Sequence, residues 1–205
     1  MILETSEYIG ITAFTISGFY IAVRHNLDIL GIFILSFLTA LGGGIVRDTI
    51  VGIAPVSFTT IYPSLIVVFV VNLLLILKFH KKTNLDRKPI FIFADSLGLV
   101  SFSIAGSIIA INSGYEISGV VILSFLTAIG GGILRDILIN EVPYILRGGF
   151  YGIIAIIIGV VIYLLNLFNL LQLTNITILF IAMVSLRLIA FYKNWQLPNI
   201  YKKIK

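Results

Sequence analysis

Two copies of a charged motif stand inside apolar sequence. An arginine is followed directly by an aspartate at Arg47-Asp48 and again at Arg135-Asp136, each time just after three consecutive glycines. Charges within apolar segments are costly, and they usually face a protein interior or a water-filled path. Each aspartate can neutralise its neighbouring arginine, or each arginine can pair across to the other copy. A third interpretation is that both side chains extend to a nearby membrane interface.

Small and hydroxyl-bearing residues precede each charged pair at helical spacing. Ser36, Ala40, Gly43 and Arg47 stand at i, i+4, i+7 and i+11, and Thr39 borders them. A stripe of this kind leaves space inside a helix bundle, and its hydroxyl and carbonyl oxygens can ligate a partly dehydrated cation. The candidate ion path comprises both copies of the motif: Ser36, Thr39, Gly42, Gly43, Gly44, Arg47, Asp48, Ser124, Thr127, Gly130, Gly131, Gly132, Arg135 and Asp136.

The glycine triplets predict local unwinding. One glycine inside a helix costs about 1 kcal/mol relative to alanine, so three in a row favour a break. A broken helix within a membrane is tolerated only where it lines a cavity or is buried in protein. The alternative is close helix packing through small residues.

Other charged residues lie near the starts and ends of apolar runs. Asp95 opens one run, and Glu7 occupies the corresponding position of an earlier one. Either carboxylate could form an acidic mouth that concentrates cations, or could simply favour a helix N-terminus. For Arg187, near the end of the last run, we expect extension to the interface or a structural pairing.

The composition is that of an integral membrane protein. The chain has 205 residues, of which 59% are hydrophobic and only 11% charged, and its mean hydropathy is +1.12. A typical soluble domain carries roughly 25% charged residues. The basic residues do not form a stripe interleaved with aromatics, which argues against a nucleic-acid partner. With no cysteine and only His25 and His80, we expect no enzyme, no cofactor and no structural metal, only transient K+ or Na+.

The motifs belong to an internal repeat. When the chain is shifted by 88 residues, 22 of the 46 positions from 10 to 55 are identical to those from 98 to 143. Seven apolar runs cover 6–23, 29–51, 60–79, 90–111, 117–139, 150–168 and 174–192. Each repeat therefore contains three spans, so the second copy enters the membrane from the opposite side. Solute paths tend to lie between such inverted repeats.

The predicted fold is an all-α integral membrane protein with seven transmembrane helices. Two inverted three-helix repeats are followed by a seventh helix, and helices 2 and 5 are broken at the glycines. The whole chain, 1–205, forms one transmembrane domain. Its parts are repeat 1 (about 5–80), repeat 2 (about 89–168), the seventh helix (about 174–193) and a basic tail (194–205).

The distribution of lysine and arginine predicts the orientation. Basic residues gather in the loop between the third and fourth runs and in the tail: Lys78, Lys81, Lys82, Arg87, Lys88, Lys193, Lys202, Lys203 and Lys205. Cytoplasmic loops carry this excess, so we expect a multi-pass protein of the cell membrane with its N-terminus outside and its C-terminus in the cytoplasm. Membrane lipids are natural partners, since the basic loop could also bind anionic head groups.

Three motifs resemble the prokaryotic branch of the trimeric intracellular cation channel family. They are the doubled Gly-Gly-Gly-x-x-Arg-Asp (42–48 and 130–136), Asp95-Ser96-Leu97-Gly98, and Arg187 with Trp195-Gln196-Leu197-Pro198. The resemblance implies a homotrimer in which each subunit holds its own pore for K+ and other monovalent cations, lined by kinked second and fifth helices. The Lys-Glu-Val signature of animal members, linked to gating and phosphoinositide binding, is absent here.

Two transport hypotheses remain open at this point. The first is a passive monovalent cation channel. The second is a small secondary transporter of a zwitterion such as glycine, because the same broad family includes bacterial members described in that way. Helix N-termini beyond the glycines would then hold the carboxylate. A structural or lipid-sensing membrane protein is a third interpretation, which the paired glycine motifs disfavour.

Overall fold

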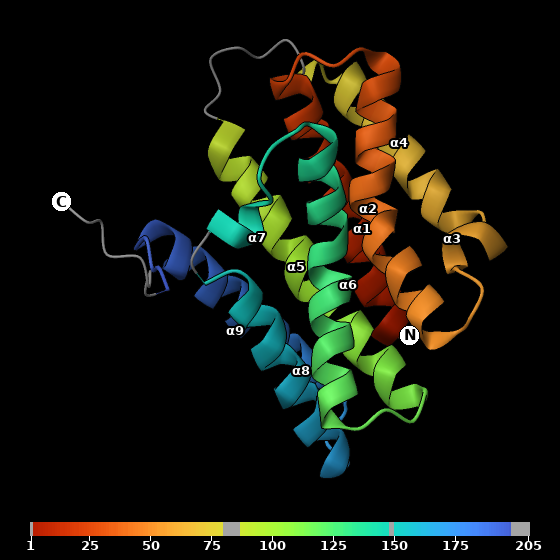
Figure 1. Ribbon diagram of the computed structural model, residues 1–205, viewed down its shortest axis with the longest axis vertical. Helices are drawn as coiled ribbons and strands as arrows, with labels where there is room; N and C mark the ends of the chain where they lie inside the picture. The colour runs from red at the N-terminus through yellow and green to blue at the C-terminus, as the bar shows by residue number, and fades with distance from the viewer. Residues whose placement is uncertain (1, 80–86, 148–149, 198–205) are drawn as a thin grey trace.

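The computed structural model describes residues 2–79, 87–147 and 150–197. Across these ranges the chain is helical, and two of its helices have only four residues (Figure 1). The helices are α1 (Ile2–Arg24), α2 (Ile29–Val51), α3 (Val56–Thr59), α4 (Tyr62–Ile76), α5 (Arg87–Asn112), α6 (Ile117–Leu138), α7 (Tyr144–Arg147), α8 (Gly152–Leu167) and α9 (Leu173–Tyr192). Each of the seven longer helices covers most of one predicted apolar run.

Local sequence explains where α2 begins and ends. The Asp28 side chain accepts a hydrogen bond from the Gly31 amide at 2.7 Å and so caps the N-terminus. Gly52 ends the helix at φ +80°, and its N–H bonds to the carbonyls of Asp48 and Thr49. A residue in this left-handed conformation is a common helix stop, and glycine adopts it without a Cβ clash.

The helix boundaries follow the internal repeat. Shifting α2 by 88 residues gives 117–139, close to α6, and shifting the four-residue α3 gives 144–147, the bounds of α7. Helices α5 and α6 run in the directions opposite to α1 and α2 (Figure 1), as an inverted repeat requires. Helix α9 has no counterpart in the first repeat.

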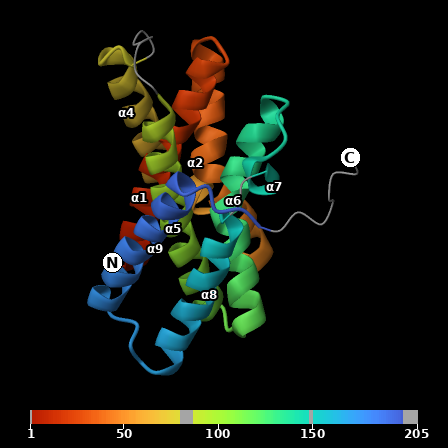
Figure 2. The same cartoon turned by 90° about the vertical axis from the view of Figure 1, so that its left-hand side faces the viewer.

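Four helices form the centre of the molecule. Helix α1 packs against α2 and α5, and α6 packs against α2 and α5. The outer helices follow the repeat, since α4 lies on α1 and α2 while α8 lies on α5 and α6. Helix α9 contacts α5 and α8 and crosses the second repeat obliquely (Figure 2).

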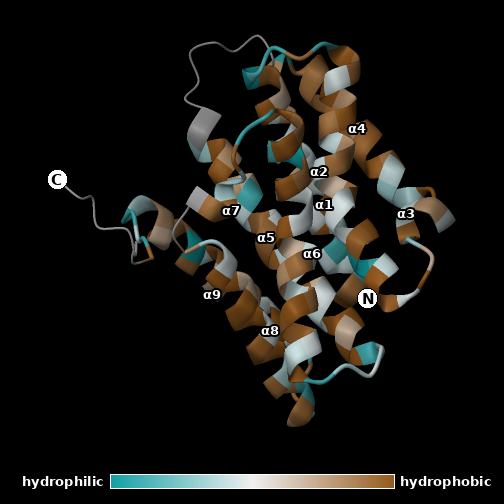
Figure 3. Cartoon of the chain, in the orientation of Figure 1, coloured by the Kyte–Doolittle hydropathy of each residue, from teal (hydrophilic) through white to brown (hydrophobic). Residues whose placement is uncertain are grey.

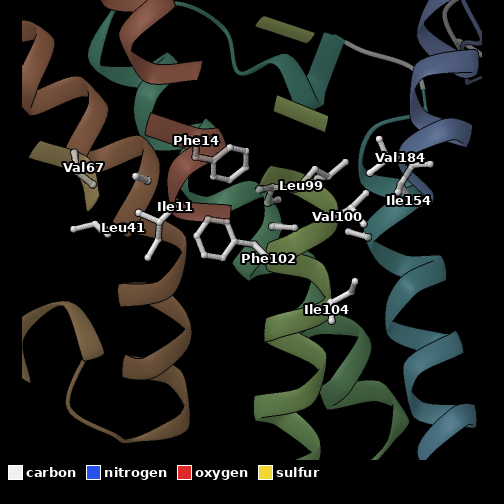
Figure 4. Close-up of a cluster of buried hydrophobic side chains, with 14 of the residues drawn as sticks. Ile11, Phe14, Leu41, Val67, Leu99, Val100, Phe102, Ile104, Ile154 and Val184 are labelled. Atoms are coloured by element: carbon white, nitrogen blue, oxygen red, sulfur yellow. The ribbon is translucent and has the colours of Figure 1, made fainter. Parts of the chain in front are cut away.

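An aromatic pair joins the two repeats in the core. Phe14 and Phe102, which are repeat counterparts, lie with ring centroids 5.3 Å apart (Figure 4). Each ring covers a glycine of the other repeat: Phe102 lies over Gly10, and Phe14 lies over Gly98. The absent Cβ atoms let α1 and α5 approach closely, as small residues do between membrane helices.

The outer surface is apolar and suits a membrane. Among the described residues, α2, α6, α9 and the segment Pro89–Asn112 of α5 are long and apolar enough to cross a bilayer. Helices α4 and α8 are apolar but shorter. Hydrophobic residues dominate the helices (Figure 3), and many of the large ones are exposed. These features define a multi-pass membrane protein.

The predicted breaks in helices 2 and 5 are not observed. Both α2 and α6 run as single helices through their glycine triplets. The reason is packing. The two helices touch at the triplets, where a Cβ on Gly43 or Gly131 would overlap a carbonyl oxygen of the opposite helix. An intact helix also keeps its backbone hydrogen bonds satisfied in an apolar surrounding. The prediction of a basic loop and tail concerns Lys81, Lys82, Lys202, Lys203 and Lys205, which lie outside the described residues.

Candidate functional site

The first buried ionic cluster joins α1 and α2. Arg47 is only 1% exposed, and its Nη2 lies 2.8 Å from Oε1 of Glu7 and 2.7 Å from Oδ1 of Asp48. Its Nε donates to the same Asp48 oxygen at 2.8 Å. The other carboxylate oxygen of Asp48 accepts a 3.0 Å hydrogen bond from the Val56 amide at the start of α3. One arginine nitrogen, Nη1, finds no hydrogen-bond partner among the described residues.

The second cluster repeats this arrangement 88 residues later. Arg135 is 2% exposed, its Nε donates to Oδ1 of Asp136 at 2.8 Å, and its Nη1 lies 3.0 Å from Oδ1 of Asp95. The Tyr144 amide at the start of α7 donates to the other Asp136 oxygen at 2.7 Å. In both repeats, therefore, the aspartate holds its arginine and also caps the following short helix.

Two neighbours of the second cluster have no equivalent in the first. The Ser17 hydroxyl, on α1 of the other repeat, accepts a 2.7 Å hydrogen bond from Nη1 of Arg135 and donates to Asp95 at 3.3 Å. The Phe91 ring lies 5.1 Å from the guanidinium carbon of Arg135. No motif marked Ser17 in the sequence, because its repeat counterpart is Ala105.

The arginines are neutralised within their own repeats. This is the local pairing that the adjacent Arg-Asp residues allowed, and in the described structure neither arginine pairs with a carboxylate of the other copy. Their burial excludes extension to the interface. Each cluster contains two carboxylates and one guanidinium, so its formal charge is −1.

Glu7 and Asp95 belong to these clusters rather than to an open entrance. Both bind the arginine of their own repeat. Their burial differs, because the side chain of Glu7 is 15% exposed and that of Asp95 is 3% exposed. The sequence identified them as repeat counterparts but did not identify their arginine partners.

A small cavity adjoins each cluster. The first, of about 20 Å³, is lined by residues that include Glu7, Arg47 and Asp48. The second, of about 10 Å³, is lined by residues that include Arg135, Asp136 and Tyr151. A cavity of this size has room for about one water molecule. Because α2 and α6 run in opposite directions, the two cavities lie on opposite sides of the point where these helices cross.

The glycine triplets form that crossing point. A Cβ on Gly43 would overlap the carbonyl oxygen of Thr127, and a Cβ on Gly131 would overlap that of Thr39. A Cβ on Gly130 would lie 3.1 Å from the Cα of Gly43. At this level α2 and α6 are in direct backbone contact, the close packing that small residues permit.

The four hydroxyl residues predicted to line the ion path are buried but do not border open space: Ser36, Thr39, Ser124 and Thr127. The side chains of Thr39 and Thr127 donate to carbonyls one turn earlier in their own helices and pack against Gly18 and Gly106. The Ser124 hydroxyl makes 3.1 Å and 2.9 Å contacts with carbonyls of α5 and α8. Ser36 has no hydrogen-bond partner among the described residues. The structure thus brings the predicted residues together around the crossing, with their small side chains used for packing.

The outer glycines of each triplet lie in less crowded surroundings than the central ones. A Cβ on Gly42 would meet the flexible end of Leu134. At Gly44 and Gly132 the nearest atoms to a built Cβ include the arginine Nη2 of the same repeat, 3.8 Å away in each case. Only the central glycines face a carbonyl oxygen of the opposite helix.

Inverted helical repeats with buried charges on both sides of a crossing define a membrane protein of the channel and transporter class. Within that class, the chain belongs to the prokaryotic branch of the trimeric intracellular cation (TRIC) channel family. The family model described as "Glycine transporter" matches residues 4–80 and 92–166, and these two stretches begin 88 residues apart.

Relatives and solved structures of this family resemble nearly the whole chain. The UPF0126 membrane protein YvgT of Bacillus subtilis (strain 168) is 35% identical over 97% of this chain and 96% of its own length. A TRIC cation channel structure covers 100% of this chain and 99% of its own, with 36% identity and a TM-score of 0.84. A prokaryotic TRIC channel crystallised in 0.5 M KCl covers 96% and 99%, with 30% identity and a TM-score of 0.86.

Proposed function

We propose that the protein is a K+-permeable monovalent cation channel whose ion path lies within each subunit, between α2 and α6. The observation that carries this proposal is the pair of buried clusters on opposite sides of the α2–α6 crossing. Each holds two carboxylates around one arginine, a formal charge of −1 before the neighbouring Arg187 is counted with the second cluster. Excess negative charge in a low-dielectric surrounding attracts cations and repels anions. The two water-sized cavities are natural resting places beside this charge.

The same contacts disfavour a site for a substrate carboxylate. The guanidinium of Arg135 already bonds to Asp95, Asp136 and Ser17, so little of its positive charge is left for an anionic ligand. A competing carboxylate would have to displace Asp136, whose other oxygen is held by the Tyr144 amide. Exchanging Asp136 for a substrate carboxylate would gain little binding free energy, and it would leave the charge of Asp136 unpaired in an apolar surrounding.

The described conformation is closed at the crossing. Gly43 and Gly131 leave no space between α2 and α6 for a hydrated or dehydrated ion. We propose that conduction requires α2 and α6 to separate at the triplets, connecting the cavities of the two clusters. Both helices remain intact in this proposal, and the candidate hydroxyls of Thr39 and Thr127 would border the opened path.

The remaining features follow the solved relatives. The similar structures are of trimeric intracellular cation channels, and we infer a homotrimer here with seven membrane spans per subunit. The basic loop and tail support a cell-membrane protein with the N-terminus outside and the C-terminus in the cytoplasm. Monovalent cations and membrane lipids are then its partners.

The test is a reversal-potential measurement on purified protein in a planar bilayer under a KCl gradient. A K+-permeable channel gives a reversal potential close to the K+ equilibrium potential, and replacing K+ by a large organic cation abolishes the current. A current that reverses near the Cl− equilibrium potential contradicts the proposal.

The description of the matching family model favours one alternative, transport of glycine or a similar zwitterion. Uptake of labelled glycine into proteoliposomes, measured on the same preparation, separates the two functions. Saturable uptake together with no K+ current identifies a transporter. K+ current with no saturable uptake identifies a channel.

A further inference from the structure

Helix α9 contributes a buried cation that the repeat does not explain. Arg187 is 3% exposed, and within the described part of the chain no carboxylate lies within ion-pair distance of it. Its Nε has no hydrogen-bond partner there either. A buried arginine without a carboxylate partner is expensive in a membrane protein, and such residues usually serve function.

Aromatic rings surround this arginine. Its guanidinium carbon lies 5.0 Å from the ring centroid of Tyr151, 5.6 Å from that of Tyr144 and 5.9 Å from that of Phe191. Its Nη2 also donates to the Tyr144 hydroxyl at 3.3 Å. Ring faces attract a cation through their quadrupole but carry no net charge, so the positive charge of Arg187 is held in place without being neutralised.

The two tyrosines connect Arg187 to the second ionic cluster. Tyr144 and Tyr151 line the cavity beside Arg135 and Asp136. The Tyr144 amide donates to Asp136, and the Tyr144 hydroxyl accepts from Arg187. Arg187 is therefore one side chain away from the second cluster.

The first cluster has no such neighbour. Where the second cavity has Tyr144 and Tyr151, the first has their repeat counterparts Val56 and Pro63. Among the described residues, the first cluster keeps its formal charge of −1. The second, with Asp95, Asp136, Arg135 and Arg187, sums to zero.

We propose that Arg187 sets the charge difference between the two ends of the ion path and thereby makes the channel rectify. This inference rests on the proposed cation-channel function. Cations collect at the end with net negative charge, since a charged, low-dielectric site raises the local counter-ion concentration. Current carried by cations entering from the first-cluster end is then larger than the current in the opposite direction.

The experiment compares single-channel current–voltage curves in symmetric KCl at low and high concentration. Because channels insert in either direction, the rectification ratio is taken as the larger conductance over the smaller at equal and opposite voltages. We expect a ratio of about twofold or more in the wild type at low salt, falling towards one at high salt because salt screens the charge. In Arg187→Met the ratio falls towards one at low salt as well.

A matched variant separates charge from packing. Arg187→Lys replaces the guanidinium by an ammonium group, which can lose its proton at a buried site. The variant should therefore retain rectification at low pH, where the lysine is charged, and lose it as the pH rises. A linear wild-type curve at low salt overturns the inference without any variant. Unchanged rectification in Arg187→Met overturns it too, as does absence of rectification at low pH in a folded Arg187→Lys. If the wild type passes no cation current, the proposed function itself has failed.

Discussion

The two ionic clusters carry the same charged groups but lie in different surroundings. In both, an arginine near the end of a central helix binds the next aspartate and an acid from the preceding helix of its own repeat. The second cluster is additionally bonded by Ser17 and flanked by Phe91, while in the first Nη1 of Arg47 has no hydrogen-bond partner within the described structure. The two repeats therefore share these charged groups, and the elements that pack around them make the surroundings of the two clusters unequal.

The largest effect is expected from breaking the local ion pairs. Asp48→Asn and Asp136→Asn each leave a buried arginine without the adjacent negative charge that pairs with it. Breaking a buried ion pair in this way costs about 3–5 kcal/mol of folding free energy. The two should be similar, because each aspartate makes the same contacts with its arginine and with the short helix that follows. Thermal unfolding of the purified variants measures this.

The same variants test the ion path. Asp48→Asn changes the charge of the first cluster from −1 to zero, and Asp136→Asn changes that of the second, counted together with Arg187, from zero to +1. The folded variants should therefore pass less K+ current and show a reversal potential shifted towards Cl−. Glu116→Gln is the control, since it removes an exposed carboxylate at the start of α6 that makes no side-chain capping hydrogen bond. Full K+ current in a folded Asp48→Asn, Asp136→Asn double variant would place the ion path elsewhere.

A second prediction concerns the crossing that separates the clusters. Gly43→Ala and Gly131→Ala each place a methyl group against a carbonyl oxygen of the opposite helix. Overpacking of this kind typically costs about 1–3 kcal/mol. Because the two contacts are related by the repeat, the two variants should lose similar amounts of thermal stability and similar fractions of the current.

The neighbouring glycines provide matched controls. A Cβ at Gly44 or Gly132 meets its nearest neighbours only at 3.8 Å. Alanine also favours a helix over glycine by about 1 kcal/mol. Gly44→Ala and Gly132→Ala should therefore be neutral or stabilising. Equal destabilisation at the central and the outer positions would mean that the crossing is not the constraint.

Much of this site could be predicted from the sequence, since the shift of 88 residues marks Arg47 and Arg135 and their adjacent aspartates. The unbroken course of α2 and α6 through the glycine triplets could not be predicted in this way. Three glycines lower helix propensity, but propensity is overridden when the opposite helix packs against the missing side chains. Ser17 and the tyrosines around Arg187 were also missed, because tertiary contacts rather than spacing bring them to the cluster.

A third prediction uses the two outer acids. Asp95 is buried and bonds to both Arg135 and Ser17, whereas Glu7 is partly exposed and, among the described residues, pairs with Arg47. Solvent weakens an ion pair, so Asp95→Asn should cost about 1 kcal/mol more than Glu7→Gln. Chemical or thermal unfolding of the two variants gives this difference. Equal losses would show that the two clusters are energetically alike.

Ser17→Ala sharpens the same comparison. It removes a hydrogen-bond partner from the second cluster and none from the first, and it reproduces the alanine found at the counterpart position 105. Combined with Asp95→Asn in a double-mutant cycle, it should show a coupling energy, since the two side chains share Arg135. The combination with Glu7→Gln should be additive.

The smallest effect is expected in the loop between α6 and α7. His25 follows α1, and its Nε2 lies 3.2 Å from Oε1 of Glu141 in the loop between α6 and α7. The backbone amide of Glu141 bonds to the Asp136 carbonyl, so the pair ties α1 to the loop beside the second cluster. The counterpart residues, Ser113 and Ile53, cannot form an ion pair.

Glu141→Gln removes the carboxylate from this contact. Because both side chains are partly exposed, the variant should lose only about 0.2–1 kcal/mol of folding free energy. Thermal unfolding measures this loss, with Glu116→Gln as the control because the Glu116 side chain makes no capping hydrogen bond. A loss no larger than that of the control would show that this loop and its counterpart in the first repeat differ in packing rather than in the contact between His25 and Glu141.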